Sequence, residues 1–197
     1  MKRSVYIWSN NPEKRELLIK YLNLNNPNII DITIIFEDIL FINESFERYN
    51  ELFNYNHVFA QFSNELKTDL SILYVNHGIF SNINNIIKEF FLNTYCKVYD
   101  AGGLVYYCFV TNDELELIDQ FYEFFARVDE ELSKTIFVFL DNNLNITQTS
   151  KDLYIHRNTL NYRLNKFELL TGINIRTLQS ASMIHSYRIR YNDRFIK

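Results

Sequence analysis

Side chains that can contact nucleic acid are concentrated in one short segment near the C-terminal end of the chain. The candidate side chains for contact with double-stranded DNA are His156, Arg157, Asn158, Thr159, Asn161, Tyr162, Arg163 and Lys166. An asparagine carboxamide can form two hydrogen bonds with the edge of an adenine, and an arginine can do the same with a guanine. Hydroxyl and basic side chains also bind phosphate oxygens. These residue types indicate DNA recognition.

The segment is expected to form a helix over Arg157–Thr171 with one apolar and one polar side. At about 100° per residue, the apolar stripe consists of Leu160, Leu164 and Phe167, and the polar side includes Asn158, Tyr162 and Asn165. Arg157 in the first turn opposes the helix dipole unless a phosphate or a guanine lies in front of it. A merely solvated helix face explains the polar side, taken alone, as well as base contact does.

The elements that position this helix also follow from the sequence. Helices are expected over Glu130–Asp141 and Ile146–Leu153, and the turn 154–156 separates the second of them from Arg157–Thr171, which ends at Gly172. A short helix, a three-residue turn and a longer helix fit the geometry of a helix-turn-helix motif.

The residue types around the turn suit the same motif. Ser150 is the small residue needed where the two helices cross, and Leu153, Ile155 and Leu160 are placed to hold them together. Tyr154 occupies a turn position where glycine is common, which is a mild departure from the pattern.

Residues 132–164 resemble the C-terminal helix-turn-helix of the PucR/CdaR transcriptional regulators. The strongest element is His156-Arg157-Asn158-Thr159-Leu160-x-Tyr162-Arg163-Leu164, followed by Leu170-Thr171-Gly172. A last expected helix, Leu178–Tyr191, resembles the closing helix of that family. The resemblance implies the fold and DNA binding for roughly a third of the chain, and it implies no effector, because the preceding residues match no sensory domain residue by residue.

The charge distribution indicates that residues 150–197 and the rest of the chain have different roles. Residues 150–197 contain nine Lys/Arg and three Asp/Glu, a net charge of +6, whereas the rest carries −10. Phosphate attracts the basic segment and repels the acidic one. A basic tail is, however, also compatible with a solvated face.

The first 111 residues are predicted to be a mixture of strands and helices. Strands are expected at Ser4–Trp8, Ile29–Phe36, His57–Phe62 and Leu70–Val75, and helices at 10–24, Glu37–Phe53 and Ser81–Asn93. A hairpin of Lys97–Tyr99 and Leu104–Val110, turning at Gly102-Gly103, would bring Cys96 and Cys108 opposite each other. Buried thiols are expected there, with a redox switch as the alternative.

The strand pattern ends near residue 111. Thr111–Glu114 has the pattern of a capping box and is expected to begin a helix that runs to Arg127. The predicted fold is therefore α+β: a mixed α/β sensory or dimerisation domain at 1–111, a connecting helix at 112–130 and an all-α helix-turn-helix domain at 131–197.

Other function classes find less support. The four histidines lack the spacing of a metal pair, and there is no nucleophile motif, so neither a metal, a cofactor nor an enzyme activity is expected. The N-terminal apolar run is too short for a signal peptide, and no stretch is long enough to span a membrane, so we expect a cytoplasmic protein. The aromatic residues of the N-terminal half suit a ligand pocket, although core packing explains them more simply.

The sequence thus predicts a sequence-specific transcriptional regulator that binds double-stranded DNA as a homodimer. The helix Asp113–Arg127 and the acidic domain are the expected dimer surfaces. One alternative is an architectural DNA-bending protein, because the Arg-Asn-Thr-Leu core also resembles the factor for inversion stimulation. The other is a protein-interaction or ligand-binding module whose helix-turn-helix does not contact DNA. A small-molecule effector remains unidentified.

Overall fold

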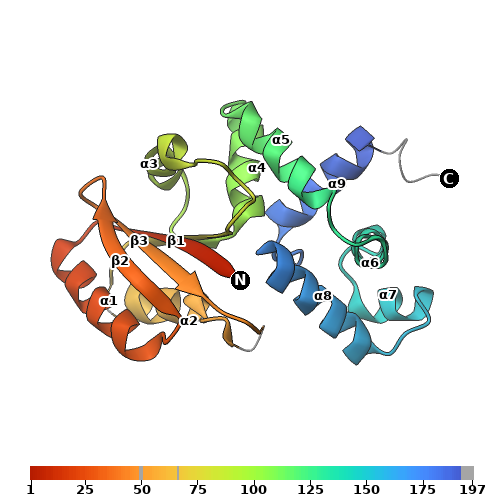
Figure 1. Ribbon diagram of the computed structural model, residues 1–197, viewed down its shortest axis with the longest axis horizontal. Coiled ribbons are helices and arrows are strands. Elements are labelled where there is room, and N and C mark those ends of the chain that lie inside the picture. Colours follow the sequence, from red (N-terminus) through yellow and green to blue (C-terminus); the bar gives the residue numbers. More distant parts are fainter. Residues whose placement is uncertain (49–50, 66, 192–197) are drawn as a thin grey trace.

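The computed structural model describes residues 1–48, 51–65 and 67–191 and has an α+β fold (Figure 1). The five strands form one sheet in the order β2-β3-β1-β4-β5. The strands are β1 (Lys2–Ser9), β2 (Ile29–Ile35), β3 (Ile39–Ser45), β4 (Leu70–Asn76) and β5 (Val98–Tyr99). All neighbours in the sheet are antiparallel except β4 and β5.

Helices cover both faces of the sheet and make up the whole C-terminal half. They are α1 (Pro12–Asn25), α2 (Tyr55–Ala60), which continues into the π-helical turn η2 (Gln61–Glu65), α3 (Asn84–Asn93), α4 (Ala101–Thr111), α5 (Leu115–Phe125), α6 (Glu130–Asp141), α7 (Ile146–Asp152), α8 (Arg157–Thr171) and α9 (Leu178–Tyr191). The predicted strands at β1, β2 and β4, and the predicted helices at α1, α3 and α6 to α9, are confirmed to within a few residues.

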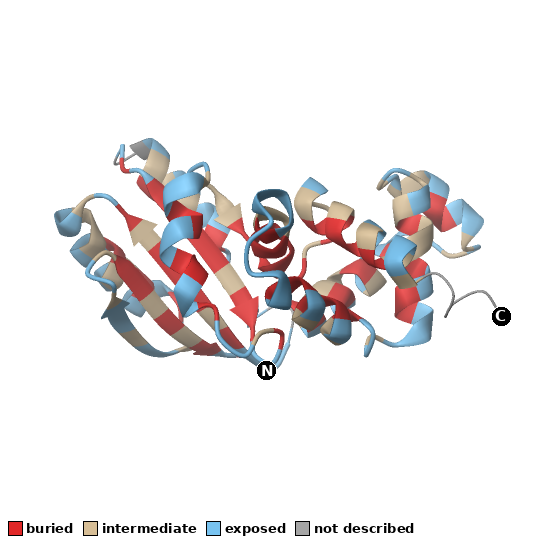
Figure 2. Cartoon of the chain, turned by 90° about the horizontal axis from the view of Figure 1, so that it is seen from above, coloured by how far each residue is buried: buried red, intermediate tan, exposed pale blue. Residues whose placement is uncertain are grey.

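The alternation of side chains along β1 produces two separate cores. Val5 and Ile7 point to the face covered by α1 and α2, whereas Tyr6 points to the face covered by α3 and α4. The second core continues into the C-terminal helices, so one buried cluster connects the sheet to the helical half (Figure 2). None of the helices in the described part of the chain is long and apolar enough to cross a membrane.

The predicted helix over Glu37–Phe53 is wrong, apart from residues 49–50, which lie outside the described residues. Phe36 and Glu37 both have positive φ, at 52° and 69°, and together with Asp38 they form a tight turn between β2 and β3. A turn of this kind matches the twist of the two antiparallel strands that it joins. The short apolar run after it is therefore a central strand, paired with β2 on one side and β1 on the other.

The strand predicted over His57–Phe62 is also wrong, because these residues lie in α2 and η2. The side chain of Asn54 caps the helix by accepting hydrogen bonds from the N–H groups of Asn56, at 3.1 Å, and of His57, at 3.3 Å. The buried Tyr55 and Val58 attach the helix to the sheet.

The predicted hairpin around Gly102-Gly103 is wrong in its second half, since residues 101–111 form α4. Asp100 caps this helix by accepting a hydrogen bond from the N–H of Gly103 at 2.9 Å. Cys108 is consequently buried in α4, and Cys96 is exposed before β5; both thiols are free. Burial raises the pKa of Cys108 to about 12, so this side chain is a packing residue.

The predicted capping box at Thr111–Glu114 does not form. Thr111 ends α4, where its hydroxyl donates to the carbonyl of Tyr107 at 3.0 Å. Asn112 and Glu114 have positive φ, so the chain reverses direction between α4 and α5, and α5 begins without a side-chain cap.

Candidate nucleic-acid interface

The predicted helix-turn-helix is formed by α7, α8 and the turn between them. Asn145 caps α7 by accepting a hydrogen bond from the N–H of Gln148 at 3.1 Å. His156 caps α8 in the same way, because its Nδ1 accepts a hydrogen bond from the N–H of Asn158 at 3.2 Å. Gly172 ends α8 in the left-handed conformation that glycine favours, with φ at 68°.

The residues expected to hold the two helices together do so. Ser150 is buried where α7 meets α8, and its carbonyl accepts a hydrogen bond from the N–H of Ile155 at 3.0 Å. Leu160 is fully buried, and Leu153 and Ile155 are partly buried against the same core. The orientation of α8 is therefore fixed by packing on its inner side.

The predicted separation of the two sides of α8 is confirmed. Leu160, Leu164 and Phe167 are each 0% exposed. The exposed residues from the cap through the second turn are His156, Arg157, Asn158, Thr159, Asn161 and Tyr162. Tyr162 in particular has an exposed fraction of 67%. Within residues 156–162, the amide, hydroxyl and guanidinium groups of α8 and its cap are thus exposed, as the groups of a DNA-reading face must be.

Arg163 has a structural environment that the sequence analysis did not anticipate. Its guanidinium donates to the hydroxyl of Thr135 at 3.1 Å and forms an ion pair with Glu131. Both partners belong to α6, so Arg163 fixes α8 against that helix. Asn165 is similarly engaged, since its side-chain oxygen accepts a hydrogen bond from Arg176 at 2.9 Å.

Fewer basic side chains are available to a ligand than the nine Lys and Arg residues of segment 150–197 suggest. Four basic side chains of residues 150–191 are in ion pairs: Arg163 with Glu131, Arg176 with Glu168, Arg188 with Asp141, and Arg190 with Asp119. Arg194 and Lys197 lie outside the described residues. Lys151, Arg157 and Lys166 are exposed and have no ion pair with any described residue. Within residues 150–191, the unpaired cations are therefore located on α7 and α8.

The structure adds Tyr154 to the candidate interface residues. It lies in the turn before α8 with φ at 53° and an exposed fraction of 96%. A bulky residue in the left-handed region is uncommon and costs conformational energy. The sequence signal was an aromatic residue where a turn commonly has glycine, and its exposure beside α8 places it with the other candidate contacts.

The described residues contain no group of three or more His, Cys, Asp or Glu side chains that is arranged to hold a metal ion. The arrangement of α7 and α8 instead offers hydrogen-bond donors, hydrogen-bond acceptors and unpaired cations on a rigid helical support. Such groups can bind a polyanion and discriminate among base edges.

Comparisons with known proteins confirm the resemblance inferred for the C-terminal segment. Residues 132–186 match the family model of the PucR C-terminal helix-turn-helix domain. The chain is 48% identical over 44 residues to the purine catabolism regulatory protein of Bacillus subtilis (strain 168), which covers 22% of this chain and 8% of that protein. It is 37% identical over 54 residues to the carbohydrate diacid regulator of Escherichia coli (strain K12), which covers 27% of this chain and 14% of that protein.

The chain therefore spans only a small part of these two relatives. A solved structure, that of a regulator of polyketide synthase expression from Bifidobacterium adolescentis, aligns with 99% of this chain and 82% of its own. The alignment has a TM-score of 0.42 and 14% sequence identity, which does not establish a shared fold.

Proposed function

We propose that this protein is a sequence-specific, non-enzymatic transcriptional regulator that inserts α8 into the major groove of DNA. The observation that carries the proposal is the polar side of α8, which is exposed along Arg157–Tyr162 while its apolar side is fully buried. The match of residues 132–186 to a helix-turn-helix family of regulators supports it. In this proposal Arg157, Asn158 and Asn161 face base edges, and Thr159 and Lys166 face phosphates.

Substitution of the two residues at the start of α8 tests the base contacts. Arg157→Ala and Asn158→Ala should each weaken binding to the preferred site by roughly 10- to 100-fold, because each removes a potentially bidentate base contact. The preferred site comes from selection of bound genomic fragments, and fluorescence anisotropy measures the affinity. Both side chains are exposed, so the unfolding transition should not move.

Asn23→Ala is a matched control, because Asn23 is an exposed asparagine on α1, beside the sheet and apart from α8 (Figure 1). If both α8 variants keep wild-type affinity for the preferred site, these residues do not read bases. If the wild-type protein binds random DNA equally well, an architectural role is supported instead.

Lys166 tests the phosphate contacts. Lys166→Ala should lower the affinity for all DNA sequences to a similar extent and reduce the slope of log affinity against log salt by about 1. Lys20→Ala on α1 removes an equally exposed lysine away from α8 and should leave the slope unchanged. An unaltered slope in Lys166→Ala would show that this ammonium group does not contact phosphate.

Homodimerisation is part of the proposal, because one recognition helix makes few base contacts and pairing on a palindrome multiplies them. The interface expected on α5 is smaller than the whole helix, since its apolar stripe, including Phe121 and Phe125, is buried within the chain. Phe109, Leu115 and Ile189 remain exposed near that helix. Light scattering of the DNA complex gives the number of protein copies per DNA site. One copy per site would contradict homodimerisation.

A further inference from the structure

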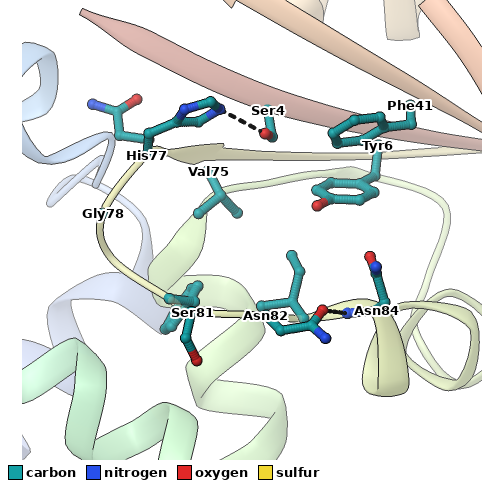
Figure 3. A pocket seen from close by; sticks show the side chains of 12 residues that line it. Ser4, Tyr6, Phe41, Val75, His77, Gly78, Ser81, Asn82 and Asn84 are labelled. Atoms are coloured by element: carbon teal, nitrogen blue, oxygen red, sulfur yellow. Dashed lines mark hydrogen bonds between the residues drawn. The ribbon is translucent and has the colours of Figure 1, made fainter.

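A cavity lies on the sheet face that carries α3, between the strands and the loop that leads from β4 to that helix (Figure 3). Its volume is about 370 Å³, within the range of sites for small molecules. Tyr6 of β1 and Phe41 of β3 form an aromatic wall, with their ring centroids 5.0 Å apart. Asn84, at the start of α3, lines the opposite side.

Two polar groups point into this cavity without protein partners. Tyr6 has an exposed fraction of only 6%, yet its hydroxyl forms no hydrogen bond with any described residue and points into the cavity (Figure 3). The carboxamide of Asn84 points toward Tyr6 from the other wall and likewise has no hydrogen-bond partner in the described part of the chain. Tyr6 is a buried residue, whereas Asn84 is exposed at the rim of the cavity. A phenol and a carboxamide that face each other across a cavity offer both donors and acceptors to a bound molecule.

The cavity is also uncharged. None of the residues that line it is Asp, Glu, Lys or Arg. Its one imidazole, His77, has Nε2 at 3.0 Å from the hydroxyl of Ser4. Desolvation, with the nearby charge of Lys2, lowers the pKa of His77, which favours the neutral ring. A charged ligand would lose hydration here without gaining an opposite charge.

We propose that this cavity binds a small, uncharged, planar molecule whose edge carries both a hydrogen-bond donor and an acceptor. The aromatic wall stacks against the plane of the molecule, and its edge bonds with Tyr6 and Asn84. Primary aromatic amides are the simplest compounds with this combination.

The cavity is connected to the C-terminal end of α8. Asn76, which lines it, donates a hydrogen bond from Nδ2 to the carbonyl of Leu169 at 3.0 Å. Gly172 lies so close that a Cβ there would be 2.7 Å from Cγ of Asn76. A molecule in the cavity that moves Asn76 would therefore change how α8 is held, and this coupling rests on the function proposed for α8.

Direct binding to the full chain tests the site without DNA. Nicotinamide and benzamide are the neutral probes, and nicotinate and benzoate are their charged counterparts of the same shape. Ligand-observed NMR should show binding of the amides with dissociation constants of about 1 mM, typical of fragments, and at least tenfold weaker binding of the acids. Asn84→Phe, which places a ring in the cavity, should abolish amide binding, whereas Asn85→Phe, at a neighbour that is not among the lining residues, should not.

The site is refuted if neither amide binds, if the acids bind equally well, or if Asn84→Phe binds as the wild type does. The coupling has its own measurement: nicotinamide at saturation should change the DNA affinity of the wild type by at least about fivefold. Asn76→Ala should lose that change, and its nicotinamide affinity in the NMR experiment distinguishes lost coupling from lost binding, because Asn76 also lines the cavity. If the wild type does not bind DNA in any condition, the function proposed for α8 is wrong, but the ligand site in the cavity is not affected. If nicotinamide binds and the DNA affinity does not change, the coupling is wrong.

Discussion

Glu44→Ala should lower the free energy of unfolding by roughly 3–5 kcal/mol, because it leaves a buried guanidinium without its counter-charge. Glu44 is 0% exposed, and Oε2 lies 2.6 Å from Nη2 of Arg3. Its other oxygen, Oε1, accepts hydrogen bonds from Asn26 and from the hydroxyl of Tyr55, both at 2.5 Å. Burial and then the charge of Glu44 raise the pKa of Tyr55 well above its ordinary value, which keeps the phenol as a donor.

Apart from Glu44, the side chains found around the guanidinium of Arg3 are aromatic. The aromatic rings of Phe46, Tyr55 and Tyr74 lie 5.3–5.4 Å from its central carbon, and the residue is 4% exposed. Aromatic faces attract a cation by about 1–2 kcal/mol, which does not offset the loss of a buried carboxylate. Since the free energy of unfolding of a domain is typically only about 5–15 kcal/mol, the Glu44→Ala variant should lose a large part of it.

Urea unfolding followed by circular dichroism measures this loss. Glu16→Ala removes an exposed glutamate of α1 and should change stability by less than about 0.5 kcal/mol. Glu44→Gln keeps the shape and an acceptor but no charge, and it should fall between wild type and Glu44→Ala. A loss below about 1 kcal/mol in Glu44→Ala would mean that Arg3 becomes hydrated, and the cluster would then not be a stabilising element.

The helix-turn-helix could be predicted from sequence because its determinants are close together in the chain. Asn145, His156 and Gly172 cap helices through hydrogen bonds that span only a few residues. The stripe of Leu160, Leu164 and Phe167 repeats within one helix. Local caps and helical periodicity are the signals that a single sequence expresses most directly.

The errors in the N-terminal half arose where a distant contact decides the structure. The run from Ile39 to Ser45 is too short and too apolar to distinguish a central strand from a buried helix, and its pairing with β1 and β2 selects the strand. The pair Gly102-Gly103 is typical of a turn, although α4 uses Gly102 for close packing against a residue of α9. The sequence around Gly102 does not indicate that Ser180 packs against it.

The candidate interface shows the same limit. The exposure of Asn158 and Tyr162 follows from the period of α8 and could be predicted. The ion pair of Arg163 with Glu131 joins residues in different helices, so sequence alone places Arg163 among the candidate DNA contacts. The structure makes Arg163 a residue that positions α8, and any contact with DNA must compete with Glu131 and Thr135.

Gly102→Ala should destabilise the protein by about 2–3 kcal/mol, although alanine is ordinarily the better helix residue by about 1 kcal/mol. A Cβ at position 102 would lie 2.3 Å from Oγ, 2.7 Å from Cβ and 2.8 Å from Cα of Ser180. Because one of these atoms belongs to the backbone of α9, a change of side-chain rotamer cannot relieve the overlap. Helices α4 and α9 must therefore move apart.

This displacement would also break the polar contacts beside the glycine. Both carboxylate oxygens of Asp100 accept the hydroxyl hydrogen bond of Ser180, at 2.7 and 2.8 Å, and one accepts the N–H of Asn174 at 2.6 Å. Asp100 is buried, so losing these donors leaves a carboxylate poorly satisfied inside the protein. The contacts join the start of α4 to the segment after α8, so they add to the hydrogen bond of Asn76 with Leu169 in connecting the N-terminal part of the chain to the helix-turn-helix.

A double-mutant cycle separates this contact from a general effect of the substitution. Ser180→Gly removes Oγ and Cβ, and should be destabilising alone because it loses the bond to Asp100 and places glycine in α9. The double variant Gly102→Ala/Ser180→Gly should be more stable than the sum of the two single losses predicts, since two of the three overlaps disappear. Strict additivity in thermal or urea unfolding would show that α4 and α9 do not meet at these residues. If they do meet there, Gly102→Ala should also weaken DNA binding without touching α8, because α9 and α8 share the core that orients the recognition helix.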